Sequence, residues 1–562
     1  MNPLFADEET CQTILWDDVF ALFQPVTPYG RRFKNAMIPE VSREDSTLQY
    51  TLRDLEQDIA NLNAAHVDVI RTVLRRVPDV DPVLACLSRN EAPIGAKDAL
   101  LLKQFALAGI ALGETLSTVL QTGKHASLDF FVDTAAFSTL RDLFGNEASP
   151  TFALQDIGNH AYRSARAAVL AAKNTLRSTK NTLFSEWASR IGVVPNEQGR
   201  IHVSRPDAVT LTKLKAMDGL GWQSDTPFES AFVVLQNDAW RLAEMQLDEA
   251  QDELDRCVRD VLQQLTHRLL VELPTWKRFV ETICNLDVRL ARVAMCLAVR
   301  GCVPKIGQRI RMHNARHVII ETRLASAQKP YVPITLELDS PVAVISGSNM
   351  GGKSVTLALV ALCQMLLQHG LPVPAEAYEA PLVDCIRVMA SVDSAFKHGL
   401  SAFGQEVWHI AQVWELRRHH ACLICLDEPG KSTNPREGEA LVQGIIDDLL
   451  SETSADCLLV ASHFPGVATR LDVNQFVVRG LRRELLDDST TAVDGLLRLR
   501  QLEAAMDYTL VRRHTGDMPM EALTVAAWLG LPKKIDEFAK QFLHRTTSFN
   551  TEGDDLELKI KP

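Results

Sequence analysis

The sequence has 562 residues, of which 46% are hydrophobic and 23% charged, and its formal net charge is −12. A chain of this length exceeds one compact core, so we expect about two to four domains of ordinary globular composition. The acidic balance argues against a surface built throughout for nonspecific DNA binding, although a local basic stripe could still hold DNA.

The eleven cysteines have no regular spacing, and the first nine residues are polar and acidic, unlike a secretory signal. We therefore predict reduced thiols and a cytoplasmic protein. Cys422 and Cys425 form a C-x-x-C inside an apolar run, where they are expected to be small buried hydrophobes and not a metal or redox pair. No uncharged apolar stretch reaches the roughly 18 residues that span a bilayer, so we expect no membrane association.

Residues 1–303 are predicted to be mostly helical, forming a core with lever arms. Apolar residues recur at three- and four-residue steps in the first two of the segments below, and the last two are rich in long helix-forming side chains. The segments are Leu48–Val77, Ala99–Leu120, Arg163–Leu183 and Trp240–Leu273. Between the last two, residues 191–228 hold Gly, Pro and an alternating stretch, which predicts a small β-containing insertion or a loop region.

The sequence pattern changes in residues 304–545, where short apolar runs alternate with segments of helical pattern. The runs are Val342–Ser346, Ile386–Ser391, Cys422–Asp427 and Cys457–Ser462. This alternation predicts an α/β domain with a mainly parallel sheet, which binds ligands at the carboxyl ends of its strands. A helical segment is expected to close the domain, and residues 546–562 are expected to form a flexible tail.

A glycine-rich loop follows the first of these runs and precedes a helical pattern. The loop consists of Gly347, Ser348, Asn349, Met350, Gly351, Gly352, Lys353 and Ser354. Its glycines let the backbone turn N–H groups toward a phosphate, and the following helix N-terminus adds positive potential. Lys353 is expected to reach the β- and γ-phosphates and Ser354 to bind Mg²⁺. The sequence therefore predicts a P-loop that binds the phosphates of a nucleotide.

Two further motifs complete the predicted site. The run beginning at Cys422 ends in Asp427 and Glu428, an apolar strand that terminates in two carboxylates. Asp427 is expected to hold Mg²⁺ beside Ser354, and Glu428 to activate the attacking water. About 35 residues later another strand pattern ends in His463, which is placed to sense the γ-phosphate.

The loop core Asn349–Ser354 resembles that of the MutS family, whose loop reads N-M-G-G-K-S. Residues 401–406, S-A-F-G-Q-E, resemble the family signature S-T-F-x-x-E, with Ala402 in place of Thr. The weaker likenesses are Ala315–His317, Tyr331–Pro333 and Pro519–Pro532 in the α/β half, and Thr27–Gly30 and Asn285–Val288 near the ends of the helical core. The resemblance implies a P-loop ATPase domain after a helical core.

The resemblance also implies a dimer, either of identical chains or with a MutS-like paralogue. In such proteins each nucleotide lies between two ATPase domains, and the signature serine, here Ser401, approaches the phosphate bound by the partner. ATP and Mg²⁺ are the implied cofactors. Closure of the dimer would complete each site and drive a clamp-like movement.

Two features depart from the mismatch-repair pattern. Gly30–Lys34 contains no F-x-E wedge of the kind that reads a mispaired base. The stretch Asp427–Gly438 reads D-E-P-G-K-S-T-N-P-R-E-G and resembles a MutS-related group thought to reactivate cobalamin-dependent aminomutases, as does Met506–Leu510. A DNA clamp without classical mismatch reading, a reactivating ATPase for a protein client, and a mismatch-repair or recombination clamp all stay open.

A DNA clamp predicts cations that face a channel. The candidates are Lys173, Arg177, Lys180, Lys213 and Lys215, around the insertion. The same residues would equally serve as a solvated helix face.

Overall fold

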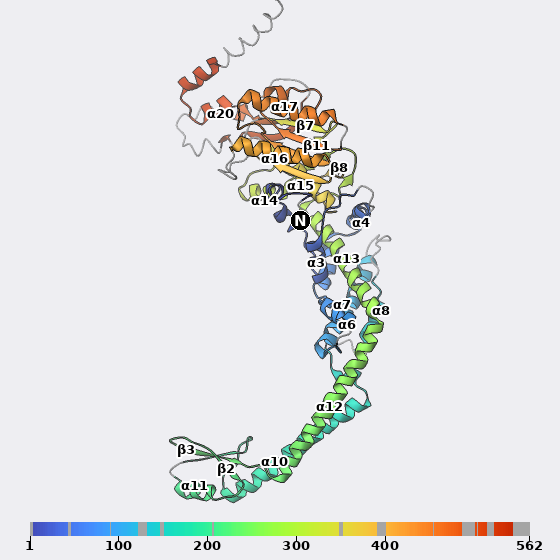
Figure 1. Ribbon diagram of the computed structural model, residues 1–562, viewed down its shortest axis with the longest axis vertical. Coiled ribbons are helices and arrows are strands. Elements are labelled where there is room, and N and C mark those ends of the chain that lie inside the picture. The colour runs from blue at the N-terminus through green and yellow to red at the C-terminus, as the bar shows by residue number, and fades with distance from the viewer. Residues whose placement is uncertain are drawn as a thin grey trace, which may run out of the picture.

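The structure, a computed structural model, describes residues 4–42, 47–89, 92–121, 132–145, 151–204, 207–347, 352–390, 401–452, 455–485, 501–502, 504–513 and 522–542. The molecule is elongated. An α/β domain lies at one end, a helical core in the middle, and a two-helix arm with a small β-domain at the other end (Figure 1). The predicted tail, 546–562, lies outside the described residues.

The helical core forms one hydrophobic cluster that joins the first third of the chain to α13, Leu273–Val299. Its other helices are α3 (Pro28–Ala36), α4 (Thr47–Asn61), α5 (Ala64–Leu74), α6 (Asp81–Arg89), α7 (Ala96–Gln121), α8 (Thr134–Asp142) and α9 (Leu154–Ile157). The buried Asp287 on α13 accepts hydrogen bonds from the backbone N–H (2.7 Å) and hydroxyl (2.6 Å) of Thr27 at the N-cap of α3. The two ends of the predicted core therefore meet.

Among the described helices, α7 is long and apolar enough over Ala96–Val119 to match a membrane span by length and composition. Half of that stretch is buried inside the molecule. Leu102, Phe105 and Leu112 are fully buried in the helical core, which accounts for the apolar composition of the helix.

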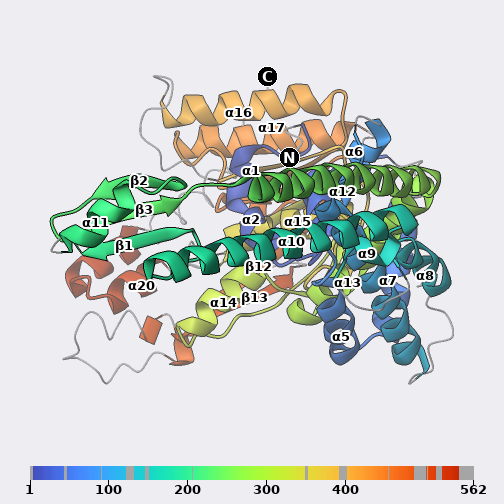
Figure 2. The ribbon, with the colours of Figure 1, turned by 90° about the horizontal axis from the view of Figure 1, so that it is seen from below.

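The arm consists of α10 (His160–Ile191) and α12 (Asp238–Val271), which lie side by side in both ribbon views (Figures 1 and 2). Both match the long helices predicted from composition. The tip carries β1 (Arg200–Ser204), α11 (Ala208–Lys215), β2 (Leu220–Asp225) and β3 (Glu229–Val234). The strands form an antiparallel sheet in the order β1-β3-β2, closed over Trp187, Phe232 and Trp240. The β-structure thus runs past residue 228.

The α/β domain is built on a six-stranded sheet in the order β13-β12-β7-β11-β10-β9. The strands are β7 (Val342–Ser346), β9 (Cys385–Met389), β10 (Cys422–Asp427), β11 (Cys457–Ala461), β12 (Asn474–Leu481) and β13 (Met506–Arg512). Every pairing is parallel except that of β12 with the edge strand β13. The expected mainly parallel sheet is confirmed.

Helices cover both faces of this sheet. The apolar α15 (Lys353–Gln368) packs on one face, and α16 (Ala402–Arg417) and α17 (Pro435–Ser451) pack on the other. The shorter elements are α14 (Val318–Ser326), α18 (Pro465–Ala468), the 3-10 turn Arg483–Leu485 and α20 (Ala522–Trp528). A second sheet, in the order β4-β8-β5-β6, is formed by β4 (Lys305–Ile306), β5 (Arg311–Ala315), β6 (Ile334–Glu337) and β8 (Ala377–Ala380).

Residues 4–23, at the start of the stretch grouped with the helical core from the sequence, pack on the α/β domain. This segment includes α1 (Glu8–Thr13) and α2 (Trp16–Phe20). The N–H of Ile386 donates to the carbonyl of Phe5 (2.6 Å), so the N-terminus extends the sheet beyond β9. The α/β domain is therefore assembled from both ends of the sequence.

The cysteines of β9 and β10 differ from the expectation of reduced thiols throughout. Cys385 and Cys422 are disulfide-bonded, because they lie directly opposite each other on adjacent strands, with their Cα atoms 4.9 Å apart. Cys425 packs in the hydrophobic cluster on the opposite face of the sheet, so the C-x-x-C does not act as a pair. In the part of the chain that the structure describes, no group of three or more His, Cys, Asp or Glu side chains is arranged to hold a metal ion.

Candidate nucleotide and magnesium site

The glycine loop joins β7 to α15, as the sequence predicts. Ser348, Asn349, Met350 and Gly351 lie outside the described residues, but both ends of the loop are placed. Gly347 has a φ of +133°, and a Cβ there would lie 3.1 Å from the carbonyl oxygen of Val478 on β12. Gly352 has a φ of +82° and caps the N-terminus of α15. Both positions require glycine because of their backbone conformation.

Lys353 is the first residue of α15, and its side chain is only 4% exposed. Its ammonium donates to the carbonyl of Gly347 (2.9 Å) and forms an ion pair with Glu428 (3.1 Å). The cation therefore lies between the carbonyl of Gly347, at the start of the loop, and the carboxylate of Glu428, and a phosphate group could replace these oxygen partners.

Ser354 and Asp427 meet as predicted. The Ser354 hydroxyl donates to Asp427 Oδ2 at 2.6 Å. Burial raises the pKa of Asp427, the bond from Ser354 lowers it, and the net shift is upward. The second oxygen, Oδ1, is buried without a hydrogen-bond partner among the described residues. One hydroxyl and one orphaned carboxylate oxygen are the hard oxygen donors that Mg²⁺ prefers, so the residues present fit this ion.

Glu428 follows the end of β10 in the left-handed region, with a φ of +52°, and its side chain is 8% exposed. Its N–H donates to the carbonyl of Ala461 on β11 (2.9 Å), which fixes this backbone. Burial would raise the pKa of Glu428, but hydrogen bonds from Lys431 and Lys353 outweigh it and hold the pKa below the ordinary value. The carboxylate is therefore ionised and oriented.

His463 follows β11, the strand beside β10. Burial lowers the pKa of its imidazole, the Glu428 carboxylate raises it, and the lysines 353 and 431 lower it, with a net downward shift. His463 lies at the same carboxyl edge of the sheet as Glu428, because β11 pairs in parallel with β10. The structure thus brings Lys353, Ser354, Asp427, Glu428 and His463 to one edge of the sheet.

Ser401 is the N-cap of α16, and its hydroxyl accepts the N–H of Gly404 at 3.1 Å. The side chain is exposed, and among the described residues no hydrogen bond or ion pair joins it to Lys353, Ser354, Asp427, Glu428 or His463. In this single chain the predicted signature serine therefore lies apart from the nucleotide site, on a surface that a second molecule could reach.

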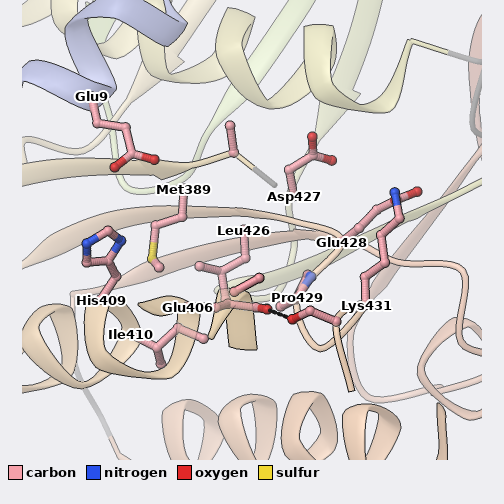
Figure 3. A pocket seen from close by; sticks show the side chains of 13 residues that line it. Glu9, Met389, Glu406, His409, Ile410, Leu426, Asp427, Glu428, Pro429 and Lys431 are labelled. Atoms are coloured by element: carbon pink, nitrogen blue, oxygen red, sulfur yellow. Dashed lines mark hydrogen bonds and ion pairs between the residues drawn. The ribbon is translucent and has the colours of Figure 1, made fainter. Parts of the chain in front are cut away.

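A cavity of about 270 Å³ separates α16 from the end of β10 (Figure 3). Glu406, one turn along α16 from Ser401, lies at its wall. The Glu406 carboxylate accepts the N–H of Gly430 and the hydroxyl of Ser432 (2.9 Å). The signature helix therefore holds the loop that follows the acidic strand end.

Three neighbours of the site were not singled out from the sequence. Lys431 pairs with Glu428 at 2.8 Å, and Glu9 from α1 lines the same cavity as Glu406. The ring of Tyr508 lies 3.6 Å from the position that a Cβ on Gly352 would take. Only the position of Lys431, three residues after Glu428, offered a signal in the sequence.

The basic residues proposed for a DNA channel are distributed over the arm. Lys173 and Arg177 are exposed on α10, and Lys213 and Lys215 end α11. Lys180 is engaged within the arm, since its ammonium lies 3.7 Å from Glu244 and 4.6 Å from the ring centre of Trp240. The structure thus separates Lys180 from the other four candidates.

The described residues bring a buried lysine, a serine and two carboxylates together at the carboxyl edge of an α/β sheet that follows a helical core, and this set of side chains fits a phosphate group and Mg²⁺. Residues 343–546 match the model of MutS domain V. This match and the relatives below support membership of the MutS family for this part of the chain.

The similar proteins share mainly this part of the chain. An Endonuclease MutS2 of Thermotoga petrophila is 35% identical over 210 residues, which cover 37% of this chain and 27% of the relative. An Endonuclease MutS2 of Maridesulfovibrio salexigens is 30% identical over 294 residues, 51% of this chain and 36% of the relative. A DNA mismatch repair protein MutS of Roseiflexus castenholzii is 31% identical over 234 residues, 38% of this chain and 21% of the relative. The aligned regions thus span about a fifth to a third of these relatives.

Proposed function

We propose that this protein is an ATPase that hydrolyses ATP with Mg²⁺ and uses the reaction to move its arm. The observation that supports it most directly is the convergence of Lys353, Ser354, Asp427 and Glu428. Lys353 would bind the phosphates, and the glycine loop would supply backbone N–H groups. Ser354 and Asp427 would hold Mg²⁺, which neutralises phosphate charge when bound. Glu428 would orient the attacking water and accept its proton.

The catalytic assignment is tested by separating ATP binding from turnover. Lys353→Ala is expected to abolish binding of a fluorescent ATP analogue, because a buried cation is lost from the phosphate site. Glu428→Ala is expected to bind the analogue normally but to release phosphate at least about 100-fold more slowly. A Glu428→Ala variant that turned over at the normal rate would refute the role given to Glu428.

We further propose that two chains close over the nucleotide, with Ser401 approaching the phosphate bound by the partner. The exposed position of Ser401 at the N-terminus of the 16-residue α16 supports this arrangement, because helix N-terminal N–H groups favour anions. ATP is expected to convert monomers of the Glu428→Ala variant into dimers in sedimentation velocity. Adding Ser401→Arg to that variant should prevent the conversion.

DNA is the partner that we propose for the arm, without classical mismatch reading. One similar protein is named as a DNA mismatch repair protein, and α10 carries six Lys or Arg and one Glu. One face of α10 forms a shallow groove of about 630 Å³ lined by polar side chains. Its lining residues include Asn174, Arg177, Ser178, Asn181, Thr182 and Ser185. Arg, Asn, Ser and Thr side chains are typical donors to phosphate oxygens.

A duplex-binding assay at several salt concentrations, with and without ATP, tests the DNA proposal. Affinity should fall steeply with salt, and the slope should become shallower in a Lys173→Ala/Arg177→Ala variant because phosphate contacts are removed. Lys180→Ala is the matched comparison, since its cation is engaged within the arm. The absence of binding at low salt would contradict a DNA clamp.

A second candidate is a reactivating ATPase for a protein client such as a cobalamin-dependent aminomutase. The specific observation in its favour is the charge of α12, which carries eight Asp or Glu against four Arg. An acidic helix along the arm repels nucleic acid but suits a basic protein surface. ATPase stimulation by such an enzyme, with no response to DNA, would support the client and exclude the clamp.

A further inference from the structure

Glu428 is held by two cations in this structure. One carboxylate oxygen lies 3.1 Å from the ammonium of Lys353, and the other lies 2.8 Å from that of Lys431. The two lysines differ in their surroundings, because the Lys353 side chain is 4% exposed and that of Lys431 is 53% exposed. Lys353 belongs to the phosphate-binding loop, whereas Lys431 belongs to the loop after β10.

ATP binding would change the ion pairs of Glu428. When Lys353 turns to the phosphates, Glu428 loses one of its two partners. A carboxylate that must orient water beside a triphosphate is then repelled by it, unless another cation compensates. Lys431 is the remaining cation within hydrogen-bond distance among the described residues.

The loop around Lys431 is fixed from the signature helix. Glu406 accepts hydrogen bonds from Gly430 and Ser432, the residues on either side of Lys431. The N–H of Lys431 also donates to the carbonyl of Glu428 at 3.3 Å, which closes a short turn. Figure 3 shows Glu406, Lys431 and Glu428 around one cavity. The position of Lys431 therefore depends on α16, the helix that begins after Ser401.

We propose that Lys431 is a positioning residue for ATP hydrolysis, holding the Glu428 carboxylate in place after Lys353 has moved to the nucleotide, and that Glu406 sets the position of Lys431. This proposal rests on the ATPase function proposed above. Any movement of α16 on dimer closure would pass through Glu406 to Lys431 and then to Glu428. The arrangement links the surface expected to meet a partner to the water-activating carboxylate of the same chain.

The test is steady-state ATP hydrolysis by the full chain, with kcat and KM determined separately. Lys431→Met keeps the length of the side chain and removes its charge. It should lower kcat between about 10- and 100-fold and leave KM and binding of a fluorescent ATP analogue within about twofold. Lys431→Arg should recover most of kcat, because it restores a cation. Glu406→Gln should lower kcat in the same way, because the amide holds the loop more weakly than the carboxylate.

Controls separate this proposal from the ATPase proposal. Lys277→Met removes an exposed lysine on α13, far along the chain from the site, and should behave as wild type. Unchanged or increased kcat in Lys431→Met, with Glu428→Ala inactive, would overturn the role of Lys431 alone. A parallel loss of ATP binding in Lys431→Met would also overturn it, since Lys431 would then be a binding residue. A wild-type chain without turnover would overturn both proposals.

Discussion

The hydroxyl of Ser354 donates a hydrogen bond to the carboxylate of Asp427 across 2.6 Å, which joins the first turn of α15 to the end of β10. These two groups are 73 residues apart in the chain. Their contact brings both proposed Mg²⁺ ligands together at the N-terminus of α15. The Oδ1 of Asp427, which has no hydrogen-bond partner among the described residues, is available as a further oxygen donor to a cation.

Removing either ligand should weaken the response to Mg²⁺. Asp427→Asn and Ser354→Ala are expected to raise the Mg²⁺ concentration required for half-maximal ATPase activity by about tenfold or more, because each removes an oxygen donor. Titration of activity with MgCl₂ measures the effect. Binding of a nucleotide analogue in EDTA should be unchanged, and Ser326→Ala, on the exposed side of α14, should titrate as wild type. An unaltered Mg²⁺ titration in Asp427→Asn would contradict the assignment.

Much of the candidate site was predictable because its motifs are local. Lys353 and Ser354 follow a glycine loop, and Asp427 and Glu428 end an apolar strand, so residue type and spacing alone indicate their roles. Lys431 was not recognised, because a lysine in a polar loop is ordinary until its contact with Glu428 is seen. That contact depends on how α16 packs.

The fold, too, was predictable from the sequence only where its signals are local. Strand-helix alternation predicted the parallel sheet and its covering helices. Periodicity could not reveal that Phe5 pairs with Ile386, because nothing local in either segment identifies a partner some 380 residues away. Nor did cysteine spacing indicate the pairing of Cys385 with Cys422, which follows from the order of the strands.

Gly430 and Gly444 provide a matched pair of glycine substitutions. Gly430 has a φ of +78°, and a Cβ there would lie 2.8 Å from the Cα of Gly438. Gly430→Ala should therefore destabilise the loop after Glu428 by roughly 1–3 kcal/mol and reduce ATPase activity. Gly444 lies in α17 with open space around it, so Gly444→Ala should stabilise the protein by about 0.5–1 kcal/mol. Urea denaturation measures the change in stability, and phosphate release measures the change in ATPase activity. Equal changes in stability in the two variants would contradict the role given to the backbone conformation of Gly430.

Arg417 on α16 is expected to be a major source of stability in the α/β domain. Its 4%-exposed side chain contacts Asp448 (2.5 Å), Glu452 (2.8 Å) and the buried Asp456 (3.1 Å). Burial lowers the pKa of Arg417, but these carboxylates outweigh it and raise it overall. Arg417→Ala would remove the ion pair of the buried Asp456, to which the N–H of Cys422 would still donate (2.7 Å), and should lower the free energy of unfolding by about 3–5 kcal/mol.

The neighbouring arginine gives the control for this substitution. Arg418 is exposed and pairs only with Glu415 one turn away among the described residues. Because exposed ion pairs contribute little, Arg418→Ala should change stability by less than about 0.5 kcal/mol. Both variants are compared by urea denaturation followed by circular dichroism. A loss below about 1 kcal/mol in Arg417→Ala would show that the Arg417 cluster contributes little to stability.

The buried His369 predicts a loss of stability at acidic pH. Burial lowers its pKa to about 4 from an ordinary value of 6.5, and Nδ1 hydrogen-bonds the carbonyl of Met365 at 2.7 Å. The unfolded chain binds a proton below pH 6.5, whereas the folded chain does so only near pH 4. The stabilising contribution of neutral His369 to the free energy of unfolding is therefore complete above pH 6.5. Between pH 6.5 and 4 this contribution falls by about 3 kcal/mol.

His369→Gln, which cannot titrate in this range, should be less stable than wild type at pH 7.5. That difference should shrink as the pH falls to 4 in urea titrations. Ser326→Ala, which changes no titratable group, should keep a constant difference from wild type over the same pH range. A constant difference between wild type and His369→Gln across this range would mean that His369 is protonated in the fold as readily as in the unfolded chain.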